Sequence, residues 1–193
     1  MIQIHDNDDY EYYKDYLLKS DIEYLNTKLA TLPWRQVEYF KKNRGKITTP
    51  RFTWVSGGCK TTTNQHPQWI LPLLEYTRNV FSNDFNYILY AKYTSSKHSI
   101  APHSDDEFFL GPSPKIAILN VGKSINFNLI NKTNKTKISF IFKNNNLILM
   151  KNNCQKNFNH EIPKGNQLDS VRYSLSFRKV IHPYGDANYN KYN

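Results

Sequence analysis

Cysteine and long apolar runs are both scarce in this chain of 193 residues. It holds two cysteines, Cys59 and Cys154, and no CxxC pair, which argues against a thiolate zinc site. No apolar run approaches the roughly 18 residues of a membrane span, so we expect no membrane partner. The segment MIQIHDNDDYEYY is acidic and polar, unlike a secretion signal. We therefore expect an intracellular protein of the cytoplasm or nucleus that is not secreted.

Acidic residues are outnumbered, because 16 Asp and Glu stand against 26 Lys and Arg for a formal net charge of +10. Excess positive charge attracts polyanions such as phosphate backbones, although a merely solubilising lysine-rich surface explains it equally well. Aromatic residues make up 15% of the chain, which excludes a disordered protein. The length predicts one compact domain, expected to be a monomer, with nucleic acid as a candidate partner.

The first 32 residues are expected to be helical. Ser20-Asp-Ile-Glu23 matches a capping box, in which two side chains satisfy free amides at the start of a helix. Apolar residues then recur with helical spacing at Ile22, Leu25 and Leu29, and Pro33 ends the pattern.

Two strands and a second helix are predicted next. Segments 34–40 and 47–55 flank a turn at Lys42-Asn-Arg-Gly45, which favours a hairpin. A helix is expected over 67–82. Its predicted apolar face consists of Trp69, Leu73, Tyr76 and Val80.

Short strands separated by Asn, Lys, Gly and Pro dominate the rest of the chain. They are predicted at 85–93, 115–121, 124–130, 137–142, 147–150 and 170–180. In the last one, Val171, Tyr173, Leu175 and Phe177 alternate with Arg172, Ser174, Ser176 and Arg178, so one face is apolar and the other polar. Many short strands after a helical start predict an α+β fold, a helix-buttressed β-sandwich or jelly roll.

Two histidines and one carboxylate are candidates for a metal site. In His103-Ser-Asp105 the two potential ligands lie two residues apart, so on an extended segment both point to one face. His160 follows later in the chain. Two His and one carboxylate form the facial triad of non-haem Fe(II) oxygenases, with open positions for cosubstrate and O₂. A solvated acidic loop is the alternative.

Two arginines strengthen the metal interpretation. Arg172 and Arg178 lie on the polar face of the final predicted strand. If that face points into a β-barrel core, each guanidinium needs an anion, because an unpaired buried charge is very costly. A small dicarboxylic acid suits this requirement. The alternative is that both arginines lie on an exposed face.

Six motifs in one order resemble the AlkB family of Fe(II)/2-oxoglutarate-dependent dioxygenases, which dealkylate nucleic-acid bases. They are Phe85-Asn-Tyr-Ile-Leu-Tyr-Ala-Lys-Tyr93, His103-Ser-Asp-Asp-Glu107, Leu147-Ile-Leu-Met150, Gln155 with Phe158, His160-Glu-Ile-Pro-Lys164 and Arg172-Tyr-Ser-Leu-Ser-Phe-Arg178. The resemblance covers roughly residues 34–180. It implies a double-stranded β-helix over 85–193, preceded by N-terminal helices and a nucleotide-recognition lid over 1–84.

The resemblance also implies roles for individual residues. His103, Asp105 and His160 are expected to hold Fe(II). The cosubstrate 2-oxoglutarate is expected to lie against Arg172, Tyr93, Ser174 and Arg178. Glu107 is expected to accept a hydrogen bond from the exocyclic amine of the target base. The hairpin before Gly57, with Arg51 and Trp54, is expected to line the base pocket, although Trp54 is equally well a core tryptophan.

Four features depart from the family pattern, and one of them is Asn146, which stands where the family usually has the glycine that opens the LLxM strand. Ala91 stands where the family usually has Asn two residues before its cosubstrate tyrosine, and Ser174 stands where it usually has Asn after its first arginine. Both changes alter hydrogen bonds expected around 2-oxoglutarate. The Tyr-Gly pair of the lid reads Ser56-Gly57, so stacking on the base is expected from another residue.

The implied activity is oxidative demethylation. O₂ oxidises 2-oxoglutarate to succinate and CO₂, and the alkyl carbon on a base nitrogen is hydroxylated, so that formaldehyde leaves from a methyl adduct. N1-methyladenine and N3-methylcytosine in DNA or RNA are the expected targets. Lysines within 41–46 and at 132, 135 and 137 are candidate phosphate contacts, or ordinary surface charge. Two alternatives stay open: a 2-oxoglutarate hydroxylase of another substrate, and a nucleic-acid-binding protein with an inactive oxygenase site.

Overall fold

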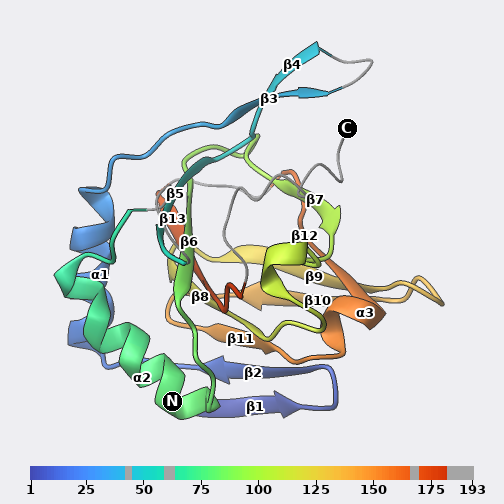
Figure 1. Cartoon of the computed structure of the whole chain (residues 1–193), viewed down its shortest axis with the longest axis horizontal. Helices are drawn as coiled ribbons and strands as arrows, with labels where there is room; N and C mark the ends of the chain where they lie inside the picture. The colour runs from blue at the N-terminus through green and yellow to red at the C-terminus, as the bar shows by residue number, and fades with distance from the viewer. Residues whose placement is uncertain (42–44, 59–63, 166–169, 182–193) are drawn as a thin grey trace.

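Two stacked antiparallel sheets form the body of the protein in this computed structural model (Figure 1). The structure describes residues 1–41, 45–58, 64–165 and 170–181. The large sheet has the spatial order β1 (Ile2–Asp6), β2 (Tyr10–Lys14), β11 (Leu147–Met150), β8 (Ile116–Gly122), β13 (Arg172–Arg178), β6 (Tyr87–Tyr93) and β5 (Phe52–Gly57). The small sheet has the order β10 (Lys137–Phe142), β9 (Ile125–Asn131), β12 (Phe158–Ile162) and β7 (Ile100–His103).

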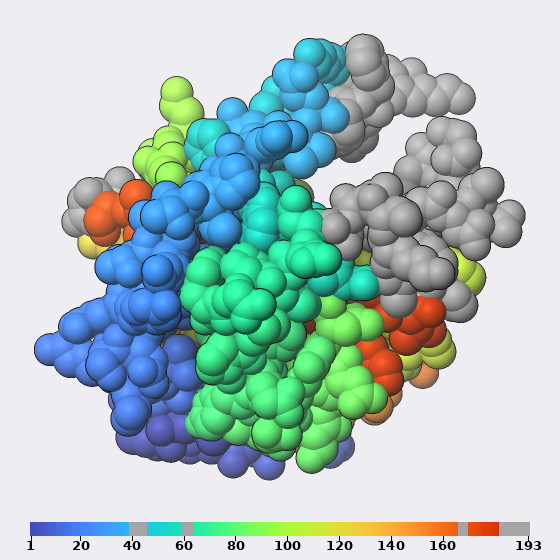
Figure 2. All heavy atoms as spheres, turned by 60° about the vertical axis from the view of Figure 1, so that its left-hand side comes forward, coloured from blue at the N-terminus to red at the C-terminus, as the bar shows by residue number. Residues whose placement is uncertain are grey.

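Helices cover the outer face of the large sheet. Helix α1 (Lys19–Ala30) and helix α2 (Leu71–Phe81), which continues a 3-10 turn at Gln68–Ile70, lie side by side over it (Figures 1 and 2). The hairpin of β3 (Glu38–Lys41) and β4 (Gly45–Thr48) projects from one end of the molecule (Figure 1). A 3-10 turn at Phe108–Leu110 and the short α3 (Cys154–Asn157) complete the helical elements of the described chain.

Alternation along each strand divides the core into two layers. In β13, Tyr173, Leu175 and Phe177 pack toward α1 and α2. The alternating polar residues of the same strand face the space between the sheets. Phe127 of β9 and Phe142 of β10 belong to a separate hydrophobic cluster there. The expected α+β jelly roll is therefore confirmed, and the polar stripe of the last strand is interior. None of the helices in the described ranges has the length and apolar character needed to cross a bilayer.

The helical prediction for residues 1–32 is wrong in its first half. Residues 2–6 and 10–14 form β1 and β2, since aromatic residues in the segment YEYYK favour a pleated, half-buried strand. The proposed capping box is also wrong, because the helix begins at Lys19 with no side-chain cap, which places Ser20 inside it. Asn145 fixes the chain entering the helix instead, through hydrogen bonds of 2.9 and 2.8 Å between its side chain and the backbone N–H and C=O of Leu17.

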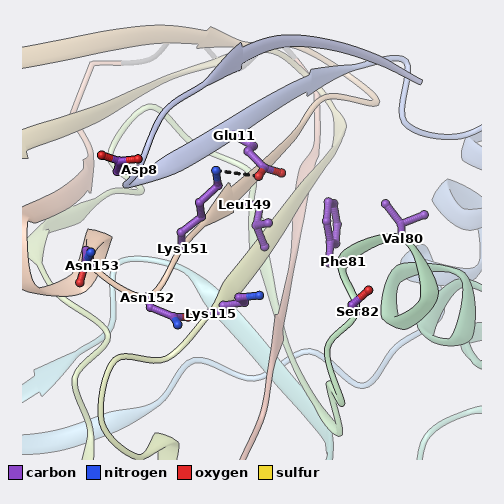
Figure 3. A pocket seen from close by; sticks show the side chains of 10 residues that line it. All are labelled: Asp8, Glu11, Val80, Phe81, Ser82, Lys115, Leu149, Lys151, Asn152 and Asn153. Carbon is purple, nitrogen blue, oxygen red and sulfur yellow. Dashed lines mark ion pairs between the residues drawn. The ribbon is translucent and has the colours of Figure 1, made fainter.

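Lys151, just after β11, forms ion pairs with residues of β1 and β2. Its Nζ lies 2.6 Å from an Asp6 carboxylate oxygen. It also lies 2.8 Å from a carboxylate oxygen of Glu11, and these two residues line a polar hollow of about 380 Å³ (Figure 3). Strand β2 also pairs with β11 along its length. Strands β1, β2 and β5 share one sheet with strands from the second half, and the division of the chain at residue 84 stays a prediction.

The buried side of α2 differs from the predicted one by one position. Ile70, Leu74 and Phe81 are buried, whereas Tyr76 of the predicted face is 41% exposed. Trp69, Leu73 and Val80 are only partly buried against the hydrophobic cluster between the helices and the large sheet. The apolar stripe is broad enough that periodicity alone does not fix which edge of it meets the sheet.

A candidate metal and cosubstrate site between the sheets

Two neighbouring strands of the small sheet bring the two histidines together. His103, the last residue of β7, is the register partner of His160 in β12, and their ring centroids lie 4.2 Å apart. Asp105 turns toward both rings, with one carboxylate oxygen 3.5 Å from His103 Nε2 and the other 3.8 Å from His160 Nε2. One ligand atom from each residue lies within 4.8 Å of the others. Two imidazole nitrogens and one carboxylate oxygen in this arrangement suit Fe(II) as a facial triad.

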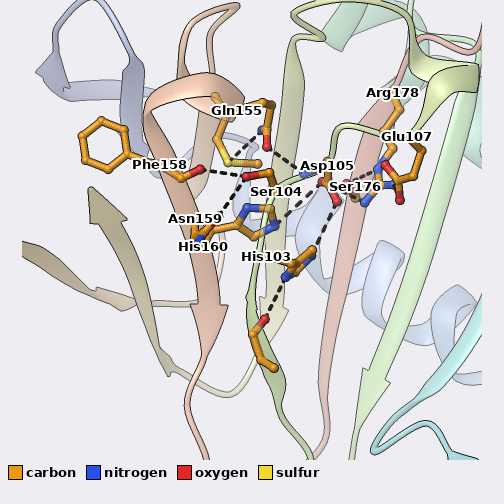
Figure 4. A network of polar contacts seen from close by, with 12 residues as sticks. His103, Ser104, Asp105, Glu107, Gln155, Phe158, Asn159, His160, Ser176 and Arg178 are labelled. Atoms are coloured by element: carbon orange, nitrogen blue, oxygen red, sulfur yellow. Dashed lines mark hydrogen bonds and ion pairs between the residues drawn. The ribbon is translucent and has the colours of Figure 1, made fainter. Parts of the chain in front are cut away.

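Hydrogen bonds from outside the triad orient its members (Figure 4). The His103 Nδ1–H donates to the carbonyl of Ala101 at 2.8 Å, which leaves Nε2 available to a metal. The backbone N–H of Asp105 donates to Oε1 of the buried Gln155 at 2.8 Å. Ser104 Oγ donates to the Phe158 carbonyl at 3.1 Å, tying the loop to β12. The motifs included Gln155, but only the structure gives it this function.

Burial and neighbouring charge set the protonation states of the triad. Burial alone raises the pKa of Asp105, but Arg178 and His160 outweigh it and hold that pKa far below its usual range. Burial lowers the pKa of His160 to about 3. For His103, burial lowers the pKa but the hydrogen bond and charge of Asp105 outweigh it, so the net pKa is raised. An ionised carboxylate and a neutral His160 are the forms that bind a metal ion.

The polar side of β13 supplies the second half of the site. Arg172, Ser174, Ser176 and Arg178 line one cavity together with the triad. Tyr93, the register partner of Arg172 in β6, lines it too. Ser176 is predicted on the polar face of this strand but not as a site residue, and its hydroxyl accepts a hydrogen bond from Arg178 Nε at 3.1 Å. The alternative of two surface arginines is wrong, because Arg172 is fully buried and Arg178 is 6% exposed.

Unsatisfied polar atoms show what this cavity requires. Arg172 Nη1 and Nη2 and the Tyr93 hydroxyl are buried without a hydrogen-bond partner in the described part of the protein. A buried guanidinium without an acceptor is costly, and a carboxylate accepts from both of its terminal nitrogens at once. The donors around this cavity therefore fit one end of a dicarboxylic acid such as 2-oxoglutarate.

Two of the residues expected to contact substrate, Arg51 and Glu107, lie at or beside the cavity. Arg51 lines the same cavity, and its Nε is buried without a partner among the residues described. Glu107 lies at the edge of the triad, and its Oε1 is 3.9 Å from Arg178 Nη1. Its Oε2 is buried and has no hydrogen-bond partner among the described residues. Burial, the leading cause, raises the Glu107 pKa. Both residues are therefore placed to meet a polar ligand.

Trp54 is not brought to the site. Its ring packs 5.1 Å from that of Tyr90 and joins the cluster beneath the helices, on the opposite face of the large sheet from the triad. Ser56 follows on the same face, fully buried and hydrogen-bonded to Tyr90 at 3.0 Å. The packing supports the alternative of a core tryptophan, and neither residue offers a surface for stacking on a base.

The candidate phosphate-binding lysines already have partners within the protein where they are described. Lys132 Nζ donates to the Gln155 carbonyl at 2.7 Å, Lys135 Nζ donates to the Lys132 carbonyl at 2.6 Å, and Lys137 pairs with Glu161 at 3.2 Å. Lys46 pairs with Glu38 at 2.7 Å. Residues 42–44 lie outside the described ranges. The hairpin lysines thus fit ordinary surface charge better than a phosphate site.

Comparisons with known proteins agree with this site. Residues 10–178 match the profile of the 2OG-Fe(II) oxygenase superfamily, and the chain belongs to it. The match includes every triad residue and both arginines of β13. Within that class, the AlkB resemblance is confirmed by curated relatives of the AlkB type.

Two relatives illustrate the extent of the similarity. Alpha-ketoglutarate-dependent dioxygenase alkB homolog 3 of Mus musculus is 29% identical over 134 residues, which is 63% of this chain and 46% of that protein. DNA oxidative demethylase ALKBH2 of Homo sapiens is 25% identical over 180 residues, which is 85% of this chain and 66% of that protein. The chain thus spans about half the length of the first of these relatives.

Proposed function

We propose that this protein is an Fe(II)- and 2-oxoglutarate-dependent dioxygenase that demethylates N1-methyladenine and N3-methylcytosine in DNA or RNA. The observation that carries the proposal is one cavity lined by both the His-Asp-His triad and a fully buried guanidinium whose two terminal nitrogens have no hydrogen-bond partner among the described residues. A relative named as a DNA oxidative demethylase and the net charge of +10 support nucleic acid as the substrate.

The residues of the site have distinct tasks in this proposal. His103, Asp105 and His160 would hold Fe(II) through two imidazole nitrogens and one carboxylate oxygen. Fe(II) with 2-oxoglutarate and O₂ supplies the oxidising chemistry that turns 2-oxoglutarate into succinate and CO₂ and adds one oxygen atom to a substrate C–H bond. Arg172 and Tyr93 bind the far carboxylate of the cosubstrate and so fix its orientation.

Substrate recognition falls to the residues at the mouth of the cavity. A methylated base must leave its stack to reach the triad, at a cost of a few kcal/mol that a weakened, methylated pair reduces. Glu107 accepts a hydrogen bond from the exocyclic amine of that base, and Arg51 offers a donor from the lid side. Hydroxylation of the N-methyl group gives an N-hydroxymethyl base, which releases formaldehyde and leaves the unmodified base.

Formaldehyde release from methylated oligonucleotides tests the proposal. The protein is incubated with Fe(II), 2-oxoglutarate and ascorbate, with N1-methyladenine or N3-methylcytosine in DNA and RNA, single- and double-stranded. Release by the wild type and none by His103→Ala is the expected result. Succinate formation without formaldehyde from any oligonucleotide would instead indicate an oxygenase of another substrate. Failure to turn over 2-oxoglutarate at all would contradict the enzyme assignment.

A further inference from the structure

Asn120 of β8 lies in one row with two small residues of the neighbouring strands. Its register partner in β13 is Ser174, and Ala91 of β6 is the partner of Ser174 on the other side. The row therefore reads Ala91, Ser174, Asn120 across three strands, directly beside the row that holds Arg172. Asn120 is completely buried and carries the one amide side chain of this row.

Every polar atom of the Asn120 side chain is used. Oδ1 accepts a hydrogen bond of 2.6 Å from Nε of Arg172. Nδ2 donates to the carbonyl of Phe142 at 3.0 Å and to the carbonyl of Lys123 at 3.2 Å. A flipped amide would set its NH₂ against the Arg172 donor and its oxygen against two carbonyls. The two carbonyls therefore fix the orientation in which Oδ1 faces the arginine.

The Arg172 guanidinium is therefore held in place by Asn120 at its Nε edge and by the Tyr93 ring at one face of its plane. Nε is satisfied by Asn120, and the guanidinium carbon lies 4.5 Å from the ring centroid of Tyr93. Nη1 and Nη2 stay without a hydrogen-bond partner in the described part of the protein. These two nitrogens form the edge that binds a carboxylate through two parallel hydrogen bonds. A guanidinium that is oriented in advance loses less entropy when the carboxylate binds.

We propose that Asn120 is the positioning residue that orients Arg172 toward the distal carboxylate of 2-oxoglutarate. The inference rests on the proposed oxygenase function. Ala91 and Ser174, the two positions where the family usually has Asn, bring no amide to this row. The amide of Asn120 on the adjacent strand supports the clamp instead.

The experiment measures selectivity between two acids. Mn(II)-loaded wild type and Asn120→Leu are titrated calorimetrically with 2-oxoglutarate and with 2-oxobutanoate, which shares the 2-oxo acid end but has no second carboxylate. Loss of the oriented clamp is expected to weaken 2-oxoglutarate about 10-fold or more and to leave 2-oxobutanoate within about 2-fold. The wild-type preference for the diacid then collapses in the variant.

Asn146→Leu is the matched control. It also removes a buried amide beside β8, but its side chain donates to the Tyr12 hydroxyl at 2.8 Å and does not contact Arg172. Its preference for the diacid is expected to equal that of the wild type. If Asn120→Leu fails to fold, Asn120→Ser, which keeps a small polar side chain, is expected to lose the same preference.

Each other result has a definite meaning. Unchanged diacid preference in a folded Asn120 variant overturns the positioning inference and leaves the oxygenase proposal intact. An equal loss of affinity for both acids also overturns it, because Asn120 would then support the site only in general. If wild-type protein loaded with Mn(II) binds neither acid, the proposed function fails together with the inference.

Discussion

Arg178 donates from Nη2 to a carboxylate oxygen of Asp105 at 2.9 Å, inside the space between the sheets. The two residues are 6% and 1% exposed, so their attraction is little screened by solvent. Nε of the same guanidinium donates to Ser176, which fixes the arginine from its own strand. Strand β13 therefore supplies the positive charge that faces Asp105, the candidate metal ligand that follows β7.

Removal of this cation is expected to weaken metal binding. In Arg178→Met the buried Asp105 loses the charge that opposes its desolvation, so its pKa rises and a proton competes with the metal. Mn(II) affinity measured calorimetrically is expected to fall by about 10- to 100-fold. Lys179→Met is the control, since that neighbouring cation pairs with Asp84 near the surface. Equal affinities in both variants would show that Arg178 does not tune the ligand.

The stability of the metal-free protein is expected to depend on His160. Its pKa is about 3 in the folded protein and close to 6.5 when unfolded, so the unfolded chain binds more protons between these values. Stability from this residue is present above pH 6.5 and is lost as the pH falls toward 3. Between pH 7.5 and 5.5 the loss is about 1.4 kcal/mol.

The free energy of unfolding in urea, measured at the two pH values for the wild type and for a variant without a titrating group at position 160, isolates this contribution. The raised pKa of His103 acts in the opposite sense, because it adds stability below the unfolded pKa that is lost as the pH rises through the folded one. The pH dependence of the wild type is therefore compared with that of His160→Gln, in which the contribution of His103 is retained. The variant is expected to lose less stability on acidification, and identical pH profiles would contradict the buried, neutral state of His160.

Gln155→Leu is expected to destabilise the loop that carries Asp105. The substitution leaves the buried N–H of Asp105 without an acceptor, at a cost of about 1–3 kcal/mol in the free energy of unfolding. Gln155→Glu keeps an acceptor oxygen and is expected to recover Mn(II) affinity relative to the leucine variant. Chemical denaturation and metal titration check the two effects, and unchanged stability in Gln155→Leu would count against the hydrogen bond.

Substitutions of Trp54 and Arg51 are expected to change different properties, namely stability for Trp54 and oligonucleotide affinity for Arg51. Trp54→Leu removes packing against Tyr90, so the melting temperature falls while affinity for a methylated oligonucleotide is kept. Arg51→Met keeps most of the stability and weakens oligonucleotide affinity, because this side chain lines the triad cavity. Fluorescence anisotropy with a labelled oligonucleotide makes the comparison. Loss of oligonucleotide affinity only in the Trp54 variant would restore it as a base-stacking residue.

The sequence predicts the site better than the elements that carry it. His103, Asp105 and Arg172 are found from motif order and from strand alternation, since both are local properties. Strands β7 and β12 are not among the predicted strands, because their short segments IAPH and FNHEI interrupt the apolar residues with Pro102 or polar residues, unlike the equally short segment LILM. Their pairing, which sets one histidine ring against the other, is a long-range contact without a local pattern.

Other features depend on the fold as a whole. Asn120 lies in an ordinary apolar strand, and only the register of β8 against β13 sets it beside Arg172. Trp54 illustrates the reverse case, since a tryptophan on a predicted lid strand suggests base stacking until the sheet assigns its face. Strand alternation defines two faces, but tertiary packing decides which one faces the site.

The most direct test of the central claim is the mass of an oligonucleotide carrying one N1-methyladenine after incubation with the protein, Fe(II), 2-oxoglutarate and O₂. Demethylation predicts a product lighter by the mass of one CH₂ group, with one succinate formed for each methyl group removed and no product with His103→Ala. An oligonucleotide of unchanged mass beside continued conversion of 2-oxoglutarate to succinate, with N3-methylcytosine substrates equally unchanged, would contradict the assignment of methylated bases as the substrate.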